Sequence, residues 1–353
     1  MKSHLLWMSL CLATPSMAAD AVQRFALVVG ANHGGSGRVV LRYAESDAEA
    51  FVSVMSDLGG LQPDNIVMLR EPTRADFMRG IRDLDRLVQQ KTGDARSEVL
   101  VYYSGHSDER GLLLYGERVG YSELRDGLDA IETDVRIAVI DSCSSGAMVR
   151  AKGGSVVAPF LVDEASGVTG HAYMTSSSAD EAAQEADRLM GSYFTHFLVT
   201  GLRGAADATG DGRVTLSEAY HFAYNETLKQ TENTRFGPQH AAHDIHLSGT
   251  GDLVLTDLSV VDAGLVFDSA LDGRLFVRDG NGRLVAELHK VPGRPVELGL
   301  GAGRYKVRLQ REDAVYEARV SVSRGERLRM DQSAFSAIER VATVARGGEA
   351  ESV

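Results

Sequence analysis

Two hydrophobic periods alternate along the first two thirds of the chain. Short, nearly continuous apolar runs such as residues 25–30, 65–69 and 172–175 end in small polar or charged residues, which is typical of buried parallel strands. Between these runs, apolar residues recur every three or four positions, which predicts amphipathic helices. The predicted helices lie near residues 48–55, 77–87, 122–131, 193–202 and 216–229. Thr73 is a suitable N-cap for the second helix. Strands that alternate with helices predict an α/β fold with a mostly parallel sheet.

Two of the predicted strands end in side chains that can carry chemistry. Residues 99–107 (VLVYYSGHS) include His106, and residues 137–146 (IAVIDSCSSG) include Cys143. Either side chain alone is more often a buried structural group. A thiol beside an imidazole, however, is the minimum for a cysteine nucleophile, because the imidazole can take the thiol proton. The carboxyl ends of parallel strands are where α/β sheets place their sites, so the pair predicts a cysteine hydrolase.

Chain length and composition limit the number of domains and the kinds of partner that we expect. The chain has 353 residues, 44% of them hydrophobic, and a formal net charge of −12. This length favours two domains. The acidic excess argues against nucleic acid or an anionic membrane as a partner.

The hydrophobic pattern changes near residues 249–251. From there to about residue 330, short alternating runs are separated by turn sequences such as residues 279–282 (DGNG), which predicts antiparallel strands. We therefore expect an α/β domain at residues 20–256, a small C-terminal β-sandwich at residues 257–331 and a flexible tail at residues 332–353.

The N-terminus has the features of a cleavable signal peptide at residues 1–19. Lys2 precedes an apolar run at residues 5–13, and small residues follow it. That run is too short to span a bilayer, and no later stretch is long enough. We expect an exported protein, periplasmic or extracellular, without a membrane span. Cys11 would be removed with the signal, which leaves Cys143 as an unpaired and therefore potentially reactive thiol.

Six ordered segments within about residues 24–255 resemble the caspase-like cysteine peptidases, especially the bacterial metacaspase-like (orthocaspase) group. The segments are residues 25–30 (FALVVG), 41–48 (LRYAESDA), 103–107 (YSGHS), 141–146 (DSCSSG), 174–181 (MTSSSADE) and 191–195 (GSYFT). Asp141 and Ser142 stand where animal caspases have Gln-Ala before the cysteine. The resemblance implies a caspase-like α/β/α sandwich, a protein or peptide substrate and no required cofactor.

The same resemblance implies catalytic roles. Cys143 would be the nucleophile and His106 the general acid that protonates the leaving amine. The backbone N–H groups of Gly105 and Cys143 would form the oxyanion hole. The sequence indicates no third catalytic group. We expect Gly105 to be glycine because the backbone must approach the substrate carbonyl closely.

Substrate specificity follows from residues that match the acidic pocket of metacaspase-like enzymes. Asp47, Ser104 and Asp141 fall at those positions, and two carboxylates suit the guanidinium or ammonium of an Arg or Lys substrate residue. In the structural alternative, Asp47 caps or pairs with its own helix. Arg38 and Arg42 lie near Asp47 in sequence and keep specificity for Asp open.

A flexible stretch after the cysteine loop contains candidate sites for self-cleavage. Arg150 and Lys152 stand beside Gly-Gly-Ser, where many relatives are cut between a large and a small part. A basic-specific enzyme would cut itself after either residue. Asp163 is the corresponding target for an acidic specificity.

A second motif resembles a calcium-binding loop. Asp207, Asp211 and Glu218 occupy the first, fifth and twelfth positions of an EF-hand-like loop, and Gly212 occupies the sixth. The alternative is a turn in which the carboxylates bond to the backbone. Histidines at residues 239–246 (QHAAHDIH) have a spacing that suggests metal, but their alternation favours an edge strand without zinc.

The rival function is a caspase-like scaffold that is retained for binding and has no catalysis. In that case the β-sandwich would recognise a protein or a glycan, and the histidine and cysteine would be relics. A peptidase that cleaves after Asn is a third alternative. A covalent thiol probe separates a reactive Cys143 from a relic.

Overall fold

The computed structural model describes residues 22–338 except 94, 144, 149–167, 179–180, 250–251 and 262. In this part of the chain an eight-stranded sheet forms the centre, with the main order β11-β7-β6-β3-β1-β2. The six strands of this order are β1 (Gln23–Ala31), β2 (Ile66–Arg70), β3 (Ser97–Asp108), β6 (Val135–Asp141), β7 (Thr169–Thr175) and β11 (Ala242–Ser248), and a hairpin at the end of β3 supplies the other two. The strands along this path pair in parallel, except that β11 runs antiparallel to β7.

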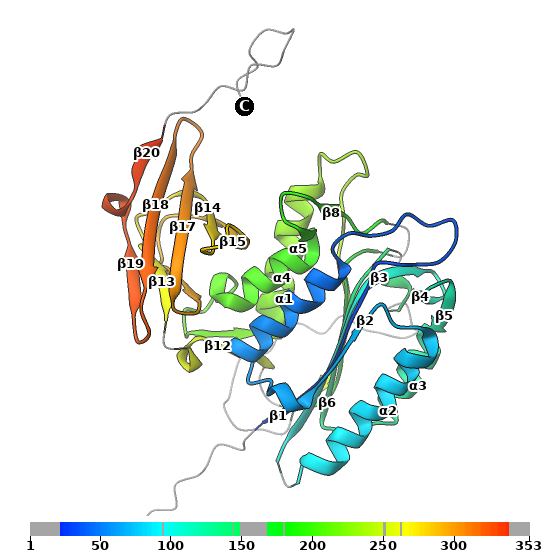
Figure 1. Cartoon of the computed structure of the whole chain (residues 1–353). Coiled ribbons are helices and arrows are strands. Elements are labelled where there is room, and N and C mark those ends of the chain that lie inside the picture. Colours follow the sequence, from blue (N-terminus) through cyan, green and yellow to red (C-terminus); the bar gives the residue numbers. More distant parts are fainter. Residues whose placement is uncertain are drawn as a thin grey trace, which may run out of the picture.

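Helices cover both faces of this sheet (Figure 1). They are α1 (Ala44–Asp57), α2 (Arg74–Lys91), α3 (Tyr121–Asp129), α4 (Tyr193–Thr200) and α5 (Leu216–Thr231). Phe51 of α1, Phe197 of α4 and Tyr220 of α5 belong to the apolar cluster on one face. Phe77 of α2 and Leu124 of α3 belong to the cluster on the other face. This arrangement confirms the predicted α/β/α sandwich.

Capping residues fix the starts of two helices. The Thr73 side chain accepts a hydrogen bond from the backbone N–H of Asp76 at the start of α2, and Asp76 accepts one from the backbone of Thr73 in return. Thr215 and Glu218 form the same capping box at the start of α5. The first box confirms the predicted N-cap. The second engages a carboxylate that the sequence also offered as a calcium ligand.

A β-hairpin that the sequence analysis did not predict extends the end of β3. It consists of β4 (Gly111–Leu114) and β5 (Glu117–Gly120). Tyr115 and Gly116 form its turn with φ values of 51° and 88°, and two positive φ values are the geometry of a tight hairpin turn. The turn lacks the usual Asn-Gly or Asp-Gly signal, so it was missed. The hairpin matters for function because Leu113 of β4 pairs with His106.

The C-terminal strands form a β-sandwich with a core of its own. The strands are β13 (Gly264–Phe267), β14 (Gly273–Arg278), β15 (Leu284–Lys290), β16 (Val296–Gly299), β17 (Gly303–Gln310), β18 (Val315–Val322), β19 (Arg327–Met330) and β20 (Ser336–Ile338). One sheet has the order β16-β13-β19 and the other β15-β14-β17-β18-β20. Leu265 of the first sheet and Val307 of the second belong to the same buried cluster.

The predicted tail begins too early. Residues 336–338 form β20, which pairs antiparallel with the start of β18. Phe335 is buried in the core of the sandwich, so burial of this ring holds the segment in place. The predicted signal peptide lies outside the described residues. No helix in the part that the structure describes is both long and apolar enough to cross a membrane.

A buried carboxylate fastens the β-sandwich to the α/β domain. Glu287 of β15 is fully buried. Its carboxylate accepts a hydrogen bond from Arg188 of the α/β domain at 2.8 Å and another from Arg274 of β14 at 2.7 Å. Its backbone N–H donates to the hydroxyl of Thr200 in α4. α4 lies between the central sheet and the sandwich (Figure 1), so these contacts join the two domains directly.

Candidate active site

The two expected catalytic side chains lie at the same edge of the central sheet. His106 is near the end of β3, and Cys143 follows the end of β6. These strands are parallel neighbours in which Ser104 pairs with Asp141. The Ser107 hydroxyl donates a hydrogen bond to the backbone carbonyl of Cys143. Parallel pairing therefore brings the two loops together at the carboxyl ends of their strands.

A backbone carbonyl orients the imidazole of His106. Its Nε2 lies 2.9 Å from the carbonyl oxygen of Val39. A carbonyl can only accept, so Nε2 carries the proton, and the neutral ring has its free lone pair on Nδ1. Burial lowers the pKa of His106, so the ring is neutral at neutral pH. No sequence signal marks this orienting group, because every residue has a backbone carbonyl.

Glycine in the loop before α1 makes room for the same imidazole. A Cβ on Gly34 would lie 2.4 Å from the ring of His106, closer than any tolerated contact. The loop can therefore cover the histidine only with glycine at this position. Val39 of the same loop is exposed, and its value to the site lies in its carbonyl.

Cys143 is a partly buried thiol. Its Sγ lies 3.9 Å from the carbonyl oxygen of Ala183. Burial raises the pKa of the Cys143 thiol, and the nearby charge of Arg38 lowers it by less. Among the described hydrogen bonds, none joins this sulfur to His106. The resting pair is therefore a neutral thiol and a neutral imidazole, which need proton transfer at the moment of attack.

The structure gives a different reason for the glycine at position 105. A Cβ there would lie 2.5 Å from the hydroxyl of Tyr103 and 2.9 Å from the carbonyl oxygen of Ala31. The Tyr103 hydroxyl donates to the carbonyl of His106 at 2.7 Å. Intramolecular packing around the strand that carries His106 thus accounts for Gly105. Our expectation that close substrate approach also requires this glycine stays a prediction.

The three expected specificity residues form a buried cluster beside the catalytic edge. Asp47, Ser104 and Asp141 are each less than 5% exposed. The Ser104 hydroxyl donates to Asp47 at 3.4 Å. Asp47 also accepts hydrogen bonds from the backbone N–H of Ser192 at 3.1 and 3.2 Å. Asp141 accepts from the hydroxyl of Thr195 at 2.6 Å and from that of Ser192. All of these partners are uncharged.

Electrostatics in this cluster oppose ionisation. Burial raises the pKa of Asp47 well above its usual range, and the charge of Asp141 raises it further. Burial also raises the pKa of Asp141, although its hydroxyl partners oppose the shift. Two close carboxylates cannot both ionise cheaply in a buried site. The cluster therefore favours a cation, which would relieve the repulsion.

Several residues of this cluster were not predicted from the sequence. Ser192 bonds to both carboxylates, and Gly191 beside it leaves space, since a Cβ there would lie 2.6 Å from an oxygen of Asp47. Glu185 is half-buried and accepts hydrogen bonds from the N–H groups of Arg42 and Tyr43 at 3.2 Å each. Burial raises the pKa of Glu185, and Asp141 raises it further. Ser192 lies in a segment that carried the family resemblance, so the signal was available.

The arginines that kept Asp specificity open lie elsewhere. Arg42 is exposed and pairs with Asp187 at 2.7 Å. Arg38 is exposed, and its charge acts on the pKa values of His106 and Cys143. Among the described residues, neither guanidinium forms a hydrogen bond or an ion pair with Asp47 or Asp141.

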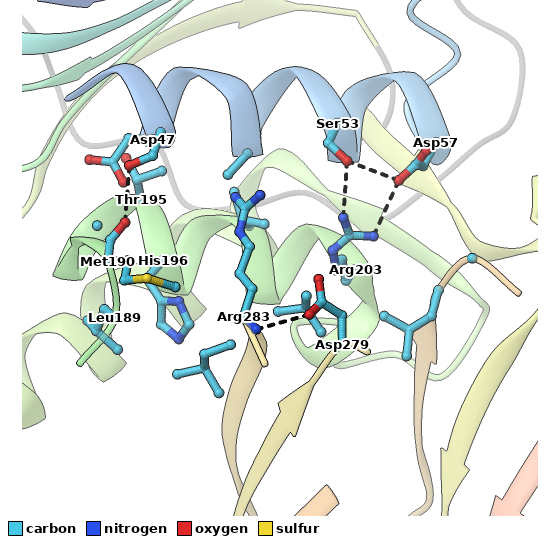
Figure 2. A pocket seen from close by; sticks show the side chains of 18 of the residues that line it. Asp47, Ser53, Asp57, Leu189, Met190, Thr195, His196, Arg203, Asp279 and Arg283 are labelled. Atoms are coloured by element: carbon cyan, nitrogen blue, oxygen red, sulfur yellow. Dashed lines mark hydrogen bonds and ion pairs between the residues drawn. The ribbon is translucent and has the colours of Figure 1, made fainter. Parts of the chain in front are cut away.

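A cavity of about 250 Å³ reaches the same cluster from the domain junction. Figure 2 shows Asp47 at one end of it and Arg203 and Arg283 further along, between α1, α4 and the sandwich. Arg203 pairs with Asp57 across this space at 3.5 Å. His106 and Cys143 are not among the lining residues. The cavity thus reaches Asp47 without including the expected catalytic side chains in its lining.

The calcium-like loop is held by backbone hydrogen bonds. Asp207 accepts from the N–H groups of Gly210 and Gly212, and Asp211 from that of Arg213. Glu218 caps α5. Among the described residues, the carboxylate oxygens of Asp207, Asp211 and Glu218 do not all lie within 4.8 Å of one another. The contacts are those of the turn alternative, and calcium binding at this loop stays a prediction.

Comparison with known proteins identifies the family to which the chain belongs. A caspase-domain model of peptidase family C14 matches residues 23–238. The chain therefore belongs to the caspase family of cysteine peptidases. Caspase-1 from Spodoptera frugiperda is a solved structure similar to it at 14% sequence identity, over 72% of this chain and 98% of that chain, with a TM-score of 0.49. No curated protein matches it.

Proposed function

We propose that the protein is an exported cysteine endopeptidase that cleaves after Arg or Lys. The observation that carries this proposal is that Asp47 and Asp141, two buried carboxylates beside His106 and Cys143, have no cationic partner among the described residues. An Arg or Lys side chain would supply that cation through charge-assisted hydrogen bonds. Asp141 stands two residues before Cys143, so a substrate held there would present its carbonyl to the thiol.

The catalytic steps use His106 and Cys143. Nδ1 of His106 takes the thiol proton as Sγ attacks the carbonyl carbon of the substrate. The backbone N–H groups of Gly105 and Cys143 would stabilise the oxyanion. The imidazolium then gives its proton to the leaving amine as the C–N bond breaks, which leaves a thioester on Cys143. Water attacks the thioester, His106 takes a proton from that water, and the thiolate released as the C–S bond breaks takes a proton from the imidazolium.

Hydrolysis of matched fluorogenic peptides tests this proposal. Peptides that differ only in a terminal Arg, Lys, Asp or Asn are incubated with the protein and with its Cys143→Ala and His106→Ala variants, each with and without calcium. We expect cleavage after Arg and Lys that falls to background in both variants. Cleavage after Asp alone would keep the catalytic pair and overturn the pocket assignment. No turnover of any peptide, with an unreactive thiol, would favour the binding scaffold.

Self-processing is the second part of the proposal. Arg150 and Lys152 lie in a Gly-rich stretch shortly after Cys143 in sequence, and outside the described residues. Prolonged incubation followed by N-terminal sequencing should give a new terminus after Arg150 or Lys152, and none in Cys143→Ala. An Arg150→Gln, Lys152→Gln double variant should remain intact. A cut after Asp163 in the active protein would support an acidic specificity instead.

Export rests on the N-terminal pattern. Expression of the full chain with its native N-terminus, followed by mass measurement of the exported protein, should show loss of about the first 19 residues. A cytoplasmic product of full mass would contradict this part alone and would leave the peptidase proposal unchanged.

A further inference from the structure

Three metal-binding side chains meet at the far edge of the central sheet, away from the catalytic pair. His171 lies on β7, and Asp244 and His246 lie on the edge strand β11. One ligand atom from each lies within 4.8 Å of the others. The residues come from segments more than 70 positions apart, so only the fold brings them together.

Strand geometry explains why the three side chains converge. His246 pairs directly with His171 in the antiparallel ladder. Asp244 is two residues from His246, so both side chains point to the same face of β11. The two imidazole rings are 5.2 Å apart, and His246 Nε2 lies 2.9 Å from the Asp244 carboxylate. The strand pairing therefore fixes the relative positions of His246, Asp244 and His171.

A neighbouring ring fixes one of the ligands. The His171 ring stacks on Tyr173 with 4.7 Å between centroids and 21° between planes. Ring stacking limits the rotation of the imidazole and reduces the entropy that a ligand must overcome. The site therefore has one held ligand on β7 and two partly exposed ligands on β11.

The charges around the triangle do not oppose a cation. Arg125 of α3 lies over Tyr173 at 5.3 Å, and Arg136 of β6 is engaged by the backbone carbonyls of Leu128 and Ile131. Asp129 of α3 lies near enough to interact with His171. Two aspartates thus offset the two arginines next to the site.

We propose that His171, Asp244 and His246 bind a transition-metal ion, with Zn²⁺ as the best fit. Two imidazole nitrogens and one carboxylate oxygen are a common Zn²⁺ donor set, with water as the fourth ligand. Ligand atoms about 2.1 Å from a tetrahedral Zn²⁺ lie about 3.4 Å from one another, which small rotations from the observed positions can reach. The ion would cross-link β11 to β7 at the sheet edge, where β11 pairs with no further strand among the described residues.

This proposal does not depend on the peptidase proposal, and its test excludes the catalytic pair. The full chain is purified without a histidine tag and with Cys143→Ala and His106→Ala, so that the dyad cannot hold the metal. Zn²⁺ affinity is measured by competition with a chromophoric chelator, and Co²⁺ is added as a spectroscopic substitute. We expect one equivalent of Zn²⁺, a tetrahedral Co²⁺ absorption band and a rise in Tm that a chelator reverses.

Variants on the same strand assign the ligands. His171→Ala and His246→Ala should each weaken Zn²⁺ binding at least about 100-fold. His243→Ala is the matched control, because His243 lies on β11 but packs against Tyr220 on the other face, and it should retain the parent affinity. If His171→Ala folds poorly, Asp244→Asn keeps the shape of its side chain and should weaken binding in the same way.

Two outcomes would overturn the proposal. One is a parent protein that does not bind Zn²⁺ in the micromolar range, which would leave the cluster as an ion pair with a stacked histidine. The other is equal binding by the parent, His171→Ala and His246→Ala, which would place any bound metal elsewhere.

Discussion

Two buried carboxylate sites in this molecule are built in opposite ways. Glu287, at the domain junction, is fully buried and has two arginine partners. Asp47 and Asp141, at the catalytic edge, are equally buried but have each other and only uncharged partners. His196 also lies at the junction, 3.7 Å from Glu287. Burial lowers the pKa of His196 to about 3, so its ring is neutral. Among the described residues, charged partners therefore compensate the burial of Glu287, whereas Asp47 and Asp141 have no such partners.

We interpret Glu287 as a structural acid and propose Asp47 and Asp141 as binding acids. A buried charge with all its partners present stabilises one arrangement of the domains, and its loss leaves unpaired charges behind. A buried pair of acids without a cation costs stability in the unliganded protein. Proteins retain such a cost mainly where a ligand supplies the missing charge. We therefore expect stability to depend on Glu287 and substrate recognition to depend on Asp47 and Asp141.

The largest effect is expected from Glu287→Ala. Removing this carboxylate leaves Arg274 and Arg188 without their partner at the junction, which should destabilise the protein by about 3–5 kcal/mol. Denaturant unfolding measures the change. Glu317→Ala is the matched control, because this carboxylate pairs with Lys306 and Arg319 at the surface of the same β-sandwich, and it should cost less than about 1 kcal/mol. Equal losses in the two variants would contradict the comparison.

Asp47→Asn should change substrate use with little change in fold. Loss of the charge that faces a basic side chain should cost about 3 kcal/mol of transition-state binding, or about 100-fold in kcat/KM for Arg and Lys peptides. The rate at which Cys143 reacts with iodoacetamide serves as the control and should be unchanged. A matching fall in both quantities would mean that Asp47 supports the catalytic pair, with no separate role in binding.

The partly buried thiol of Cys143 extends the comparison. Burial raises the pKa of the Cys143 thiol above its usual value of 9.0, and burial lowers the pKa of His106 below 6.5. The thiolate fraction should then rise about tenfold with each pH unit up to at least pH 9. Iodoacetamide rates measured from pH 6 to 9.5 check this. A plateau between pH 6 and 8 would instead indicate a preformed thiolate–imidazolium pair.

The sequence predicted the elements and the position of the candidate site better than the contacts that hold its residues in place. Periodicity located the sheet, its helices and the strand ends that carry His106 and Cys143, because these are local patterns. The carbonyl of Val39 could not be found in this way, since a backbone group has no residue type. The hairpin turn at Tyr115 has positive φ values without the usual turn residues, so tertiary packing decides it.

Long-range pairing sets the other limit. Ser192 reaches Asp47 and Asp141 from 145 and 51 positions away in the sequence, and spacing alone cannot predict this. The same holds for His171, which completes a cluster for which the sequence suggested only the histidines at residues 239–246. In both cases the sequence contains suitable residue types but does not indicate which of them lie close together in the folded chain. Burial was equally hidden, and it is burial that shifts the pKa values at the site.

The smallest effect is also the most specific test of the comparison. The pKa of Asp47 is raised by burial and by Asp141 above 3.8, so the folded protein holds this proton more tightly than the unfolded chain. The contribution of this group to stability is therefore present at pH values below 3.8 and is lost as the pH rises from there through the raised pKa. Asn at this position does not ionise.

Asp47→Asn should accordingly match the parent near pH 4 and exceed it at pH 7, by about 1 kcal/mol or about 2–4 °C in Tm. Melting curves of both proteins across this range measure the difference. Glu287→Gln, which removes a charge that has its partners, should be less stable than the parent at pH 7. If both amides destabilised the protein equally at pH 7, the acids at the catalytic edge would be as well compensated as the acid at the junction. A cationic substrate would then gain nothing from entering their site.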